Sequence, residues 1–195
     1  MNIKQLITKN QKRWDNMHLN ASRIPTFDYI AKRLVAKKDI YQKIEAATKV
    51  PWFVIAVIHE RESGQDFTKQ LSQGDSLNQV SRHDPKGRGP FYGDDAFYRA
   101  ALDALIDCPP HASKWTDWTA GGAMTLLEEY NGLGYAAMGV PSAYVWSGSD
   151  QYKSGKYVAD HVYRAGVVDV QEGCAPLIAR MMALDPSIQF TKEAA

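Results

Sequence analysis

The chain has few cysteines, no long hydrophobic run and almost no net charge. Its 195 residues include two cysteines, Cys108 and Cys174, which lie far apart and form neither a metal-ligand spacing nor a redox pair. We expect free thiols, with one long-range disulfide bond as the alternative. The longest apolar run, residues 52–58, is far shorter than the roughly 20 residues that span a bilayer. The sequence therefore predicts no integral membrane segment.

The amino-terminal segment argues against a signal peptide, and the charge balance argues against attraction of nucleic acid by the protein as a whole. Residues 1–7 lack the apolar core of a signal peptide, and Lys9, Lys12 and Arg13 follow soon after. We therefore expect this segment to belong to the fold and the protein to be cytoplasmic. The 23 basic and 22 acidic side chains leave a net charge of +1, so no overall field attracts nucleic acid.

The histidines and the glycine-rich turn do not form a known binding motif. No His-Glu-x-x-His or comparable signature includes His59, His83, His111 or His161. Lys86 and Arg88 lie among glycines, but no Gly-Lys-Ser/Thr sequence follows them, so we interpret this turn as a mobile edge of a cleft. We expect no metal and no cofactor.

Apolar residues recur at helical spacing through most of the chain, and no strand-like alternation of any length appears. Helices are predicted at residues 27–35, 40–50, 51–63, 94–107, 117–130, 156–164 and 175–184. Asp39 and Asp117 are the expected N-caps of two of them. With 45% hydrophobic residues the chain can form one domain over residues 1–195, and two lobes around a cleft would also fit. We expect a mainly α fold with little or no β-sheet.

Residues 65–93 form a long predicted loop without periodicity. Its stretch at residues 84–90 consists of residues typical of turns. Long loops in compact domains are usually functional or disordered. We interpret this one as the wall of a cleft, because it follows a helix that ends in carboxylates.

That helix is apolar on every face until its last turn. Pro51 suits the first turn, residues 52–58 leave no polar face, and Gly64 offers the stop. Glu60 and Glu62 therefore emerge at the edge of the core. Burial and the negative end of the helix dipole both favour the neutral form of a carboxyl group, so we expect a raised pKa there. A carboxylic acid of this kind can protonate a sugar oxygen near neutral pH.

Three ordered blocks of residues make the chain similar to a known family. They are Ile58–Asp75, which contains Glu-Ser-Gly at 62–64; Tyr130–Tyr135, which begins Tyr-Asn-Gly; and Tyr144–Val158, which contains Trp146. The chain resembles the lysozyme-like superfamily of goose-type lysozymes and lytic transglycosylases, and within it a group of bacterial and phage lysozyme-like proteins. The blocks cover roughly residues 50–163. The resemblance implies a lysozyme-like α-helical fold with a substrate cleft.

The resemblance also implies catalytic roles. Glu62, rather than Glu60, matches the family's catalytic acid, and Asp75 has a spacing similar to the aspartate that positions water in goose-type enzymes. A loop aspartate such as Asp75 can equally cap a turn, and Asp66 and Glu128 are alternatives for the second carboxylate. A carboxylate separation of roughly 5 Å would indicate a covalent retaining mechanism, and roughly 6.5–9.5 Å would leave room for an attacking water.

Substrate contacts are expected from residues near the motifs, namely Ser63, Tyr130, Asn131, Gly132, Tyr135 and Trp146. The amide of Asn131 would bind an N-acetyl group or a sugar hydroxyl, although Asn before Gly is also a common helix ending. Tyr135, Tyr144 and Trp146 would stack on sugar faces or, alternatively, pack in a small core.

Together these inferences predict an N-acetylmuramidase that acts as a monomer on peptidoglycan. It would cleave the β-1,4 bond between N-acetylmuramic acid and N-acetylglucosamine. The missing signal peptide suits a phage or prophage endolysin that stays in the cytoplasm until it is released to the cell wall. The alternatives are a lytic transglycosylase, which shares the acid and yields anhydro-muropeptides, and a non-catalytic glycan-binding or phage structural module of the same fold.

Overall fold

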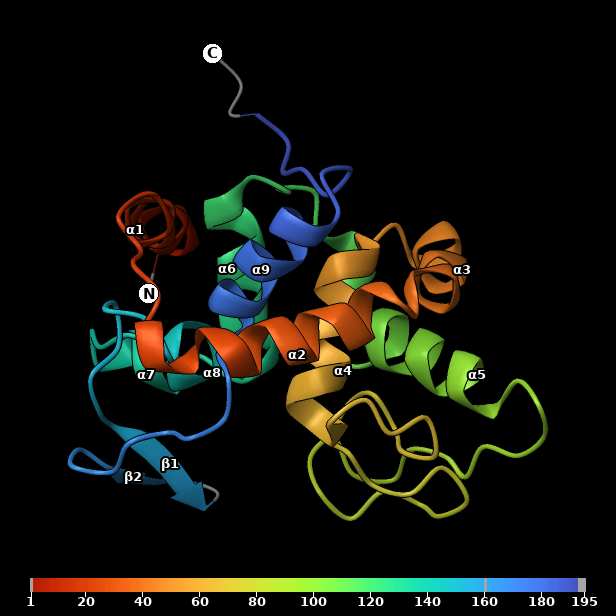
Figure 1. Cartoon of the computed structure of the whole chain (residues 1–195). Helices are drawn as coiled ribbons and strands as arrows, with labels where there is room; N and C mark the ends of the chain where they lie inside the picture. Colours follow the sequence, from red (N-terminus) through yellow and green to blue (C-terminus); the bar gives the residue numbers. More distant parts are fainter. Residues whose placement is uncertain (1, 160, 193–195) are drawn as a thin grey trace. The chain divides into compact units, whose positions relative to one another are not determined.

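The computed structural model describes residues 2–159 and 161–192, and the chain divides into two compact units. The first unit consists of the chain up to Arg33 and from Asp117 onwards, and the second is Leu34–Thr116. Helices make up most of the regular structure (Figure 1), which confirms the mainly α class.

The elements are as follows. The first unit contains α1 (Ile3–Asp15), the 3-10 helix η1 (Ala21–Arg23), α6 (Ala120–Tyr130), α7 (Gly134–Ala137), α8 (Ala143–Trp146), β1 (Lys156–Ala159), β2 (Val162–Arg164) and α9 (Cys174–Leu184). The second contains α3 (Lys38–Thr48), α4 (Trp52–Ser63), α5 (Ala96–Leu102), its π-helical continuation η2 (Asp103–Asp107) and η3 (Ala112–Lys114). Helix α2 (Ile24–Val35) carries the chain from the first unit into the second.

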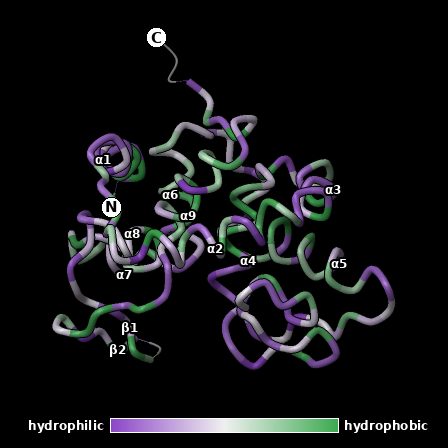
Figure 2. The backbone as a smooth tube through the Cα atoms, in the orientation of Figure 1, coloured by the Kyte–Doolittle hydropathy of each residue, from purple (hydrophilic) through white to green (hydrophobic). Residues whose placement is uncertain are grey.

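Helix α4 is buried along almost its whole length. Pro51 precedes its first turn, and residues 52–59 are all buried. The hydropathy colouring of Figure 2 shows much of this helix as hydrophobic. The helix ends because Gly64 adopts φ +63°, and the N–H of Gln65 then donates to the carbonyl of His59 at 3.3 Å. This left-handed ending is the one that glycine allows most readily.

Helix α1 packs along α6 in the first unit. The two backbones approach closely at Gly121, where an added Cβ would lie 2.5 Å from the carbonyl oxygen of Ile7. The buried side chain of Asn10 donates from Nδ2 to Thr125 Oγ1 at 3.1 Å and to Glu128 Oε2 at 3.2 Å. The contact between α1 and α6 therefore contains a buried polar cluster as well as apolar packing.

Two of the predicted helix starts need correction. Asp39 lies inside the first turn of α3, whose N-cap residue is Lys37, so the predicted cap at Asp39 is wrong. The cap of α6 is Thr119, whose side chain accepts a hydrogen bond from the N–H of Gly122 at 3.1 Å. Asp117 supports that cap by accepting a hydrogen bond from the Thr119 hydroxyl at 2.6 Å.

A β-hairpin replaces the helix predicted at residues 156–164. β1 and β2 are antiparallel, with Tyr157 opposite Tyr163. Their rings lie 5.5 Å apart, and both meet the ring of Tyr135 edge-on, at 5.1 and 6.1 Å. Aromatic cross-strand pairs stabilise antiparallel strands. Packing on Tyr135, far away in the sequence, overrides the weak helical spacing of this segment.

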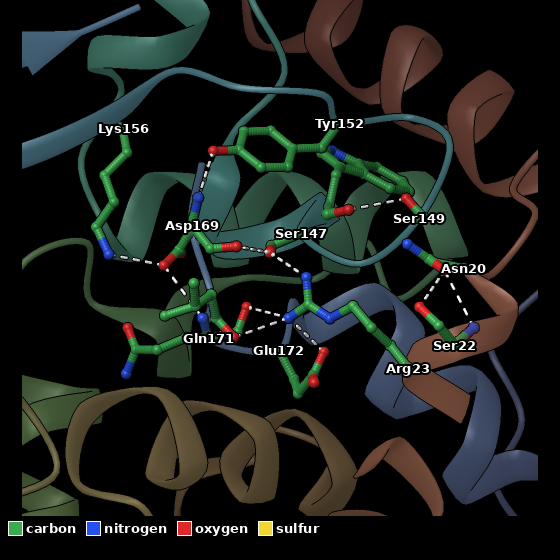
Figure 3. A network of polar contacts seen from close by, with 12 residues as sticks. Asn20, Ser22, Arg23, Ser147, Ser149, Tyr152, Lys156, Asp169, Gln171 and Glu172 are labelled. Carbon is green, nitrogen blue, oxygen red and sulfur yellow. Dashed lines mark hydrogen bonds and ion pairs between the residues drawn. The ribbon is translucent and has the colours of Figure 1, made fainter. Parts of the chain in front are cut away.

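A polar network fixes the segment that follows the hairpin (Figure 3). Asp169 is 1% exposed, and its carboxylate accepts a hydrogen bond from Lys156 Nζ at 2.7 Å. The Ser147 hydroxyl donates to the Asp169 carbonyl at 2.9 Å. The guanidinium of Arg23 donates to Ser147 Oγ at 3.2 Å and forms an ion pair with Glu172 at 2.6 Å. Because buried charges are tolerated only when they are paired, this network holds the segment against η1 and the end of α8.

The structure also bears on the cysteines and on membrane-spanning helices. Cys108 and Cys174 are both buried and neither takes part in a disulfide bond, which confirms the prediction of free thiols. None of the described helices combines the length and the apolar character that a bilayer crossing needs.

Candidate active site

Glu62 lies on the last turn of α4, where the helix leaves the core, and it is partly exposed. The next side chain, Ser63, donates its hydroxyl hydrogen to the carbonyl of His59 at 3.1 Å. This bond closes the final turn of the helix and uses the one hydrogen that the Ser63 side chain can donate. The predicted contact of Ser63 with substrate stays a prediction.

The loop after α4 returns to the backbone of Glu62. Gly74 has φ +73°, and a Cβ added there would collide with the carbonyl oxygen of Glu62 and lie 3.3 Å from its carbonyl carbon. Glycine alone permits this approach. Gln70, 1% exposed, shapes the turn, because its carbonyl accepts the N–H of Gly74 at 3.0 Å and its Nε2 donates to the carbonyl of Ser76 at 3.2 Å. Asp75 therefore directly follows a residue that touches Glu62.

The carboxylate of Asp75 is bound by its own loop. Oδ2 accepts the backbone N–H groups of Arg82 at 2.8 Å and His83 at 3.1 Å, and Oδ1 lies 2.8 Å from His83 Nδ1. Partial burial favours the neutral form, but these hydrogen bonds outweigh it and hold the pKa of Asp75 below its usual value. Asp75 thus stays ionised at neutral pH and closes the turn between residues 75 and 83. Its catalytic role is a proposal.

The rest of the loop is anchored as well. The hydroxyl of Ser81 donates to the carbonyl of Pro85 and accepts the N–H of Arg88, both at 2.8 Å. Arg88 forms an ion pair with Asp103 of η2, in which Nε lies 2.8 Å from Oδ2, and this pairing raises the pKa of the guanidinium. The ion pair ties Arg88 to η2, and the interpretation of this turn as a mobile edge of a cleft stays a prediction.

His59 supports α4 from inside the second unit. It is fully buried, its Nδ1 lies 3.0 Å from the Tyr41 hydroxyl, and its ring is 4.6 Å from the rings of both Phe67 and Phe97. Burial lowers the pKa of His59 to about 4, against the opposing effect of Asp66. Sequence reasoning did not assign it this role, although a single polar residue at the end of an apolar run was the available signal.

The other carboxylates near the motifs have structural partners. Glu60 accepts a hydrogen bond from Gln65 Nε2 at 2.7 Å, and Asp66 accepts the N–H of Thr68 at 2.9 Å in a local turn. Glu128 is fully buried on α6, where burial raises its pKa against the effects of nearby polar groups. Glu128 is therefore wrong as a cleft-facing second carboxylate, because no part of it reaches solvent.

The remaining predicted contacts lie in the first unit. Asn131 is the C-cap residue of α6 and is exposed, directly after the partly buried Tyr130, and Gly132 continues the turn with φ +90°. Tyr135 is 4% exposed and Trp146 is fully buried. Stacking of Tyr135 or Trp146 on a sugar is thus a wrong prediction, because both rings belong to the core.

That correction extends to Tyr144, which is also 4% exposed. The alternative interpretation of these aromatic residues, packing in a core, is the one that the structure supports.

Neither a group of metal-binding side chains nor a match to a known protein adds to the description of this site. Within residues 2–159 and 161–192, no group of three or more His, Cys, Asp or Glu side chains could hold a metal ion. No protein-family model, curated protein or solved structure matches the chain. Function must therefore be inferred from the residues and their geometry.

Proposed function

We propose that the protein is a peptidoglycan-cleaving glycoside hydrolase, an N-acetylmuramidase, with Glu62 as its general acid. The observation that carries this proposal is the end of α4. There a buried helix delivers a partly exposed glutamate, and a glycine of the following loop contacts its backbone and is itself followed by an ionised aspartate. Two carboxyl groups in unlike environments are the arrangement on which glycosidases depend.

The chemistry follows from those environments. Glu62, at the mouth of an apolar helix, would donate its proton to the leaving glycosidic oxygen as the bond to the anomeric carbon breaks. Asp75 would orient the water that attacks the same carbon. The exposed amide of Asn131, in the first unit, would bind a sugar hydroxyl or an N-acetyl group.

Replacement of Glu62 by glutamine tests the proposal. Glu62→Gln keeps the size of the side chain and removes the proton donor, so we expect the cleavage of purified peptidoglycan to fall about 10²- to 10⁴-fold. Glu60→Gln is the matched control, since it changes a carboxylate two positions away that is hydrogen-bonded to Gln65. Turbidity loss of purified cell walls measures both. Full activity of Glu62→Gln, or an equal loss in both variants, would rule out Glu62 as the acid.

One observation favours a lytic transglycosylase as the second candidate. Both oxygens of Asp75 are bound within its own loop, and a transglycosylase needs no second carboxylate because the 6-hydroxyl of the sugar attacks the anomeric carbon. Mass spectrometry of the released muropeptides distinguishes the two reactions. Products that are lighter by one water identify the transglycosylase, and reducing ends identify the hydrolase.

A further inference from the structure

The first unit contains a small polar pocket that the proposed reaction does not use. It has a volume of about 320 Å³ and is lined by Lys9, Lys12, Arg13, Asn16 and Gln151. This volume is at the lower end of the range for small-ligand sites, roughly 300–1,000 Å³. Three of its five lining side chains are cations and the other two are amides, so the pocket offers hydrogen-bond donors and positive charge.

Helical periodicity explains why the cations converge. Residues 9, 12, 13 and 16 follow the spacing i, i+3, i+4, i+7, which places them on one face of α1 and its C-cap. Lys9 and Lys12 are exposed, and no ion pair joins either of them to any other residue that the structure describes. Two ammonium groups are therefore available to an anion.

Arg13 forms the fixed part of the pocket. Its Nη1 donates to Asn10 Oδ1 at 3.0 Å, and the Asn10 amide in turn donates to Glu128 at 3.2 Å inside the contact between α1 and α6. Burial lowers the pKa of the guanidinium, and the negative charge of Glu128 opposes that effect. A guanidinium that is held in place loses little rotamer freedom when an anion binds.

The opposite wall is also anchored. Gln151 Nε2 donates to the carbonyl of Asn16 at 3.3 Å, and the backbone N–H of Asp150 donates to the carbonyl of His18 at 2.9 Å. The carboxylate of Asp150 accepts the N–H of His18 and a hydrogen of Gln151 Nε2, both at 2.9 Å, and lies 3.1 Å from the ring of His18. The lining of the pocket itself contains no carboxylate.

We propose that this pocket binds a phosphate group through the two lysines and Arg13. A phosphate carries more than one negative charge and several acceptor oxygens, which suits three converging cations better than a single carboxylate does. The phosphate can come from a soluble ion or from a phospholipid headgroup. The proposal does not depend on the reaction assigned to Glu62.

Isothermal titration of the full chain with inorganic phosphate, at constant ionic strength in chloride, tests the site. We expect saturable binding with a dissociation constant of about 1 mM or tighter. The double variant Lys9→Gln/Lys12→Gln should weaken binding about fivefold for each lysine, as expected for the loss of a unit charge near the ligand in water. The matched control Lys32→Gln/Lys37→Gln makes the same change in net charge at exposed positions outside the pocket, and should change the constant less than about twofold.

A second experiment identifies the source of the phosphate. It measures whether the protein sediments with vesicles of phosphatidylglycerol or with vesicles of phosphatidylcholine. Sedimentation with phosphatidylglycerol alone, lost in Lys9→Gln/Lys12→Gln and retained in the control, identifies a lipid headgroup. Saturable binding of inorganic phosphate without vesicle binding identifies a soluble phosphate. Equal weakening in the two double variants, or no binding in either arm, overturns the proposal.

Discussion

Substitution of Gly74 by alanine should lower both the stability of the protein and its rate of peptidoglycan cleavage. Gly74 has φ +73°, a conformation that costs a non-glycine residue about 1–2 kcal/mol. The added Cβ also collides with the carbonyl oxygen of Glu62, and such overpacking costs about 1–3 kcal/mol. The free energy of unfolding should therefore fall by about 2–5 kcal/mol.

The same collision should reduce the rate of wall cleavage. To relieve it, the loop or the end of α4 must shift by on the order of 1 Å, and a displacement of that size at a catalytic group can cost about 10²-fold in rate. Glu62 and Asp75 are the groups that would move. Turbidity assays on purified peptidoglycan measure this loss in the same samples as the unfolding experiments.

Gly87→Ala is the matched control. Gly87 lies in the same loop with φ +79°, but an added Cβ there meets nothing within 4 Å. It should lose only the conformational part, about 1–2 kcal/mol, and keep its activity. Equal losses of stability and activity in the two variants would refute the idea that the loop presses on the backbone of Glu62.

Two further predictions concern buried titratable groups. Because the pKa of His59 is lowered to about 4, the unfolded chain binds a proton at higher pH than the folded chain does. The free energy of unfolding should therefore decline as the pH falls below 6.5 and level off near pH 4, by about 3 kcal/mol in total. NMR titration of the ring should show it neutral down to about pH 4. The raised pKa of Glu128 has the opposite sign, since its contribution is present below the usual pKa near 4.5 and is lost as the pH rises through the raised value. Glu128→Gln should thus gain in thermal stability relative to the wild type as the pH rises toward neutrality, and a constant difference at all pH values would contradict the assignment.

The second unit was the easier part to predict, because its main signals are local. The apolar run at residues 52–58 and the glycine at position 64 predict α4 and its end without reference to any other part of the chain. The π-helical turn of η2 gave no such signal. It continues α5 up to the point where Cys108 and two prolines stop regular structure, which is where the predicted helix ends.

The residues whose surroundings differ from the prediction have partners that are distant in the sequence. A glutamate in a helix is usually a surface residue, and the partners of the buried Glu128, such as Asn10, lie more than a hundred positions earlier in the sequence. The hairpin packs on Tyr135, and the ring of Trp146, which is expected to stack on a sugar, is instead fully buried. Local periodicity cannot distinguish an aromatic ring that packs inward from one that offers its face to a ligand.

The pairing of α1 with α6 has a consequence for the way the chain is made. Asn10 and Glu128 are 118 residues apart, and the whole of the second unit, Leu34–Thr116, is encoded between the two helices. At a synthesis rate of 5–20 residues per second, roughly 6 to 24 s pass between the synthesis of Asn10 in α1 and that of Glu128 in α6. During that interval the contiguous second unit can fold, while the apolar side of α1 stays uncovered. Early chaperone contacts with nascent chains should therefore concentrate on α1.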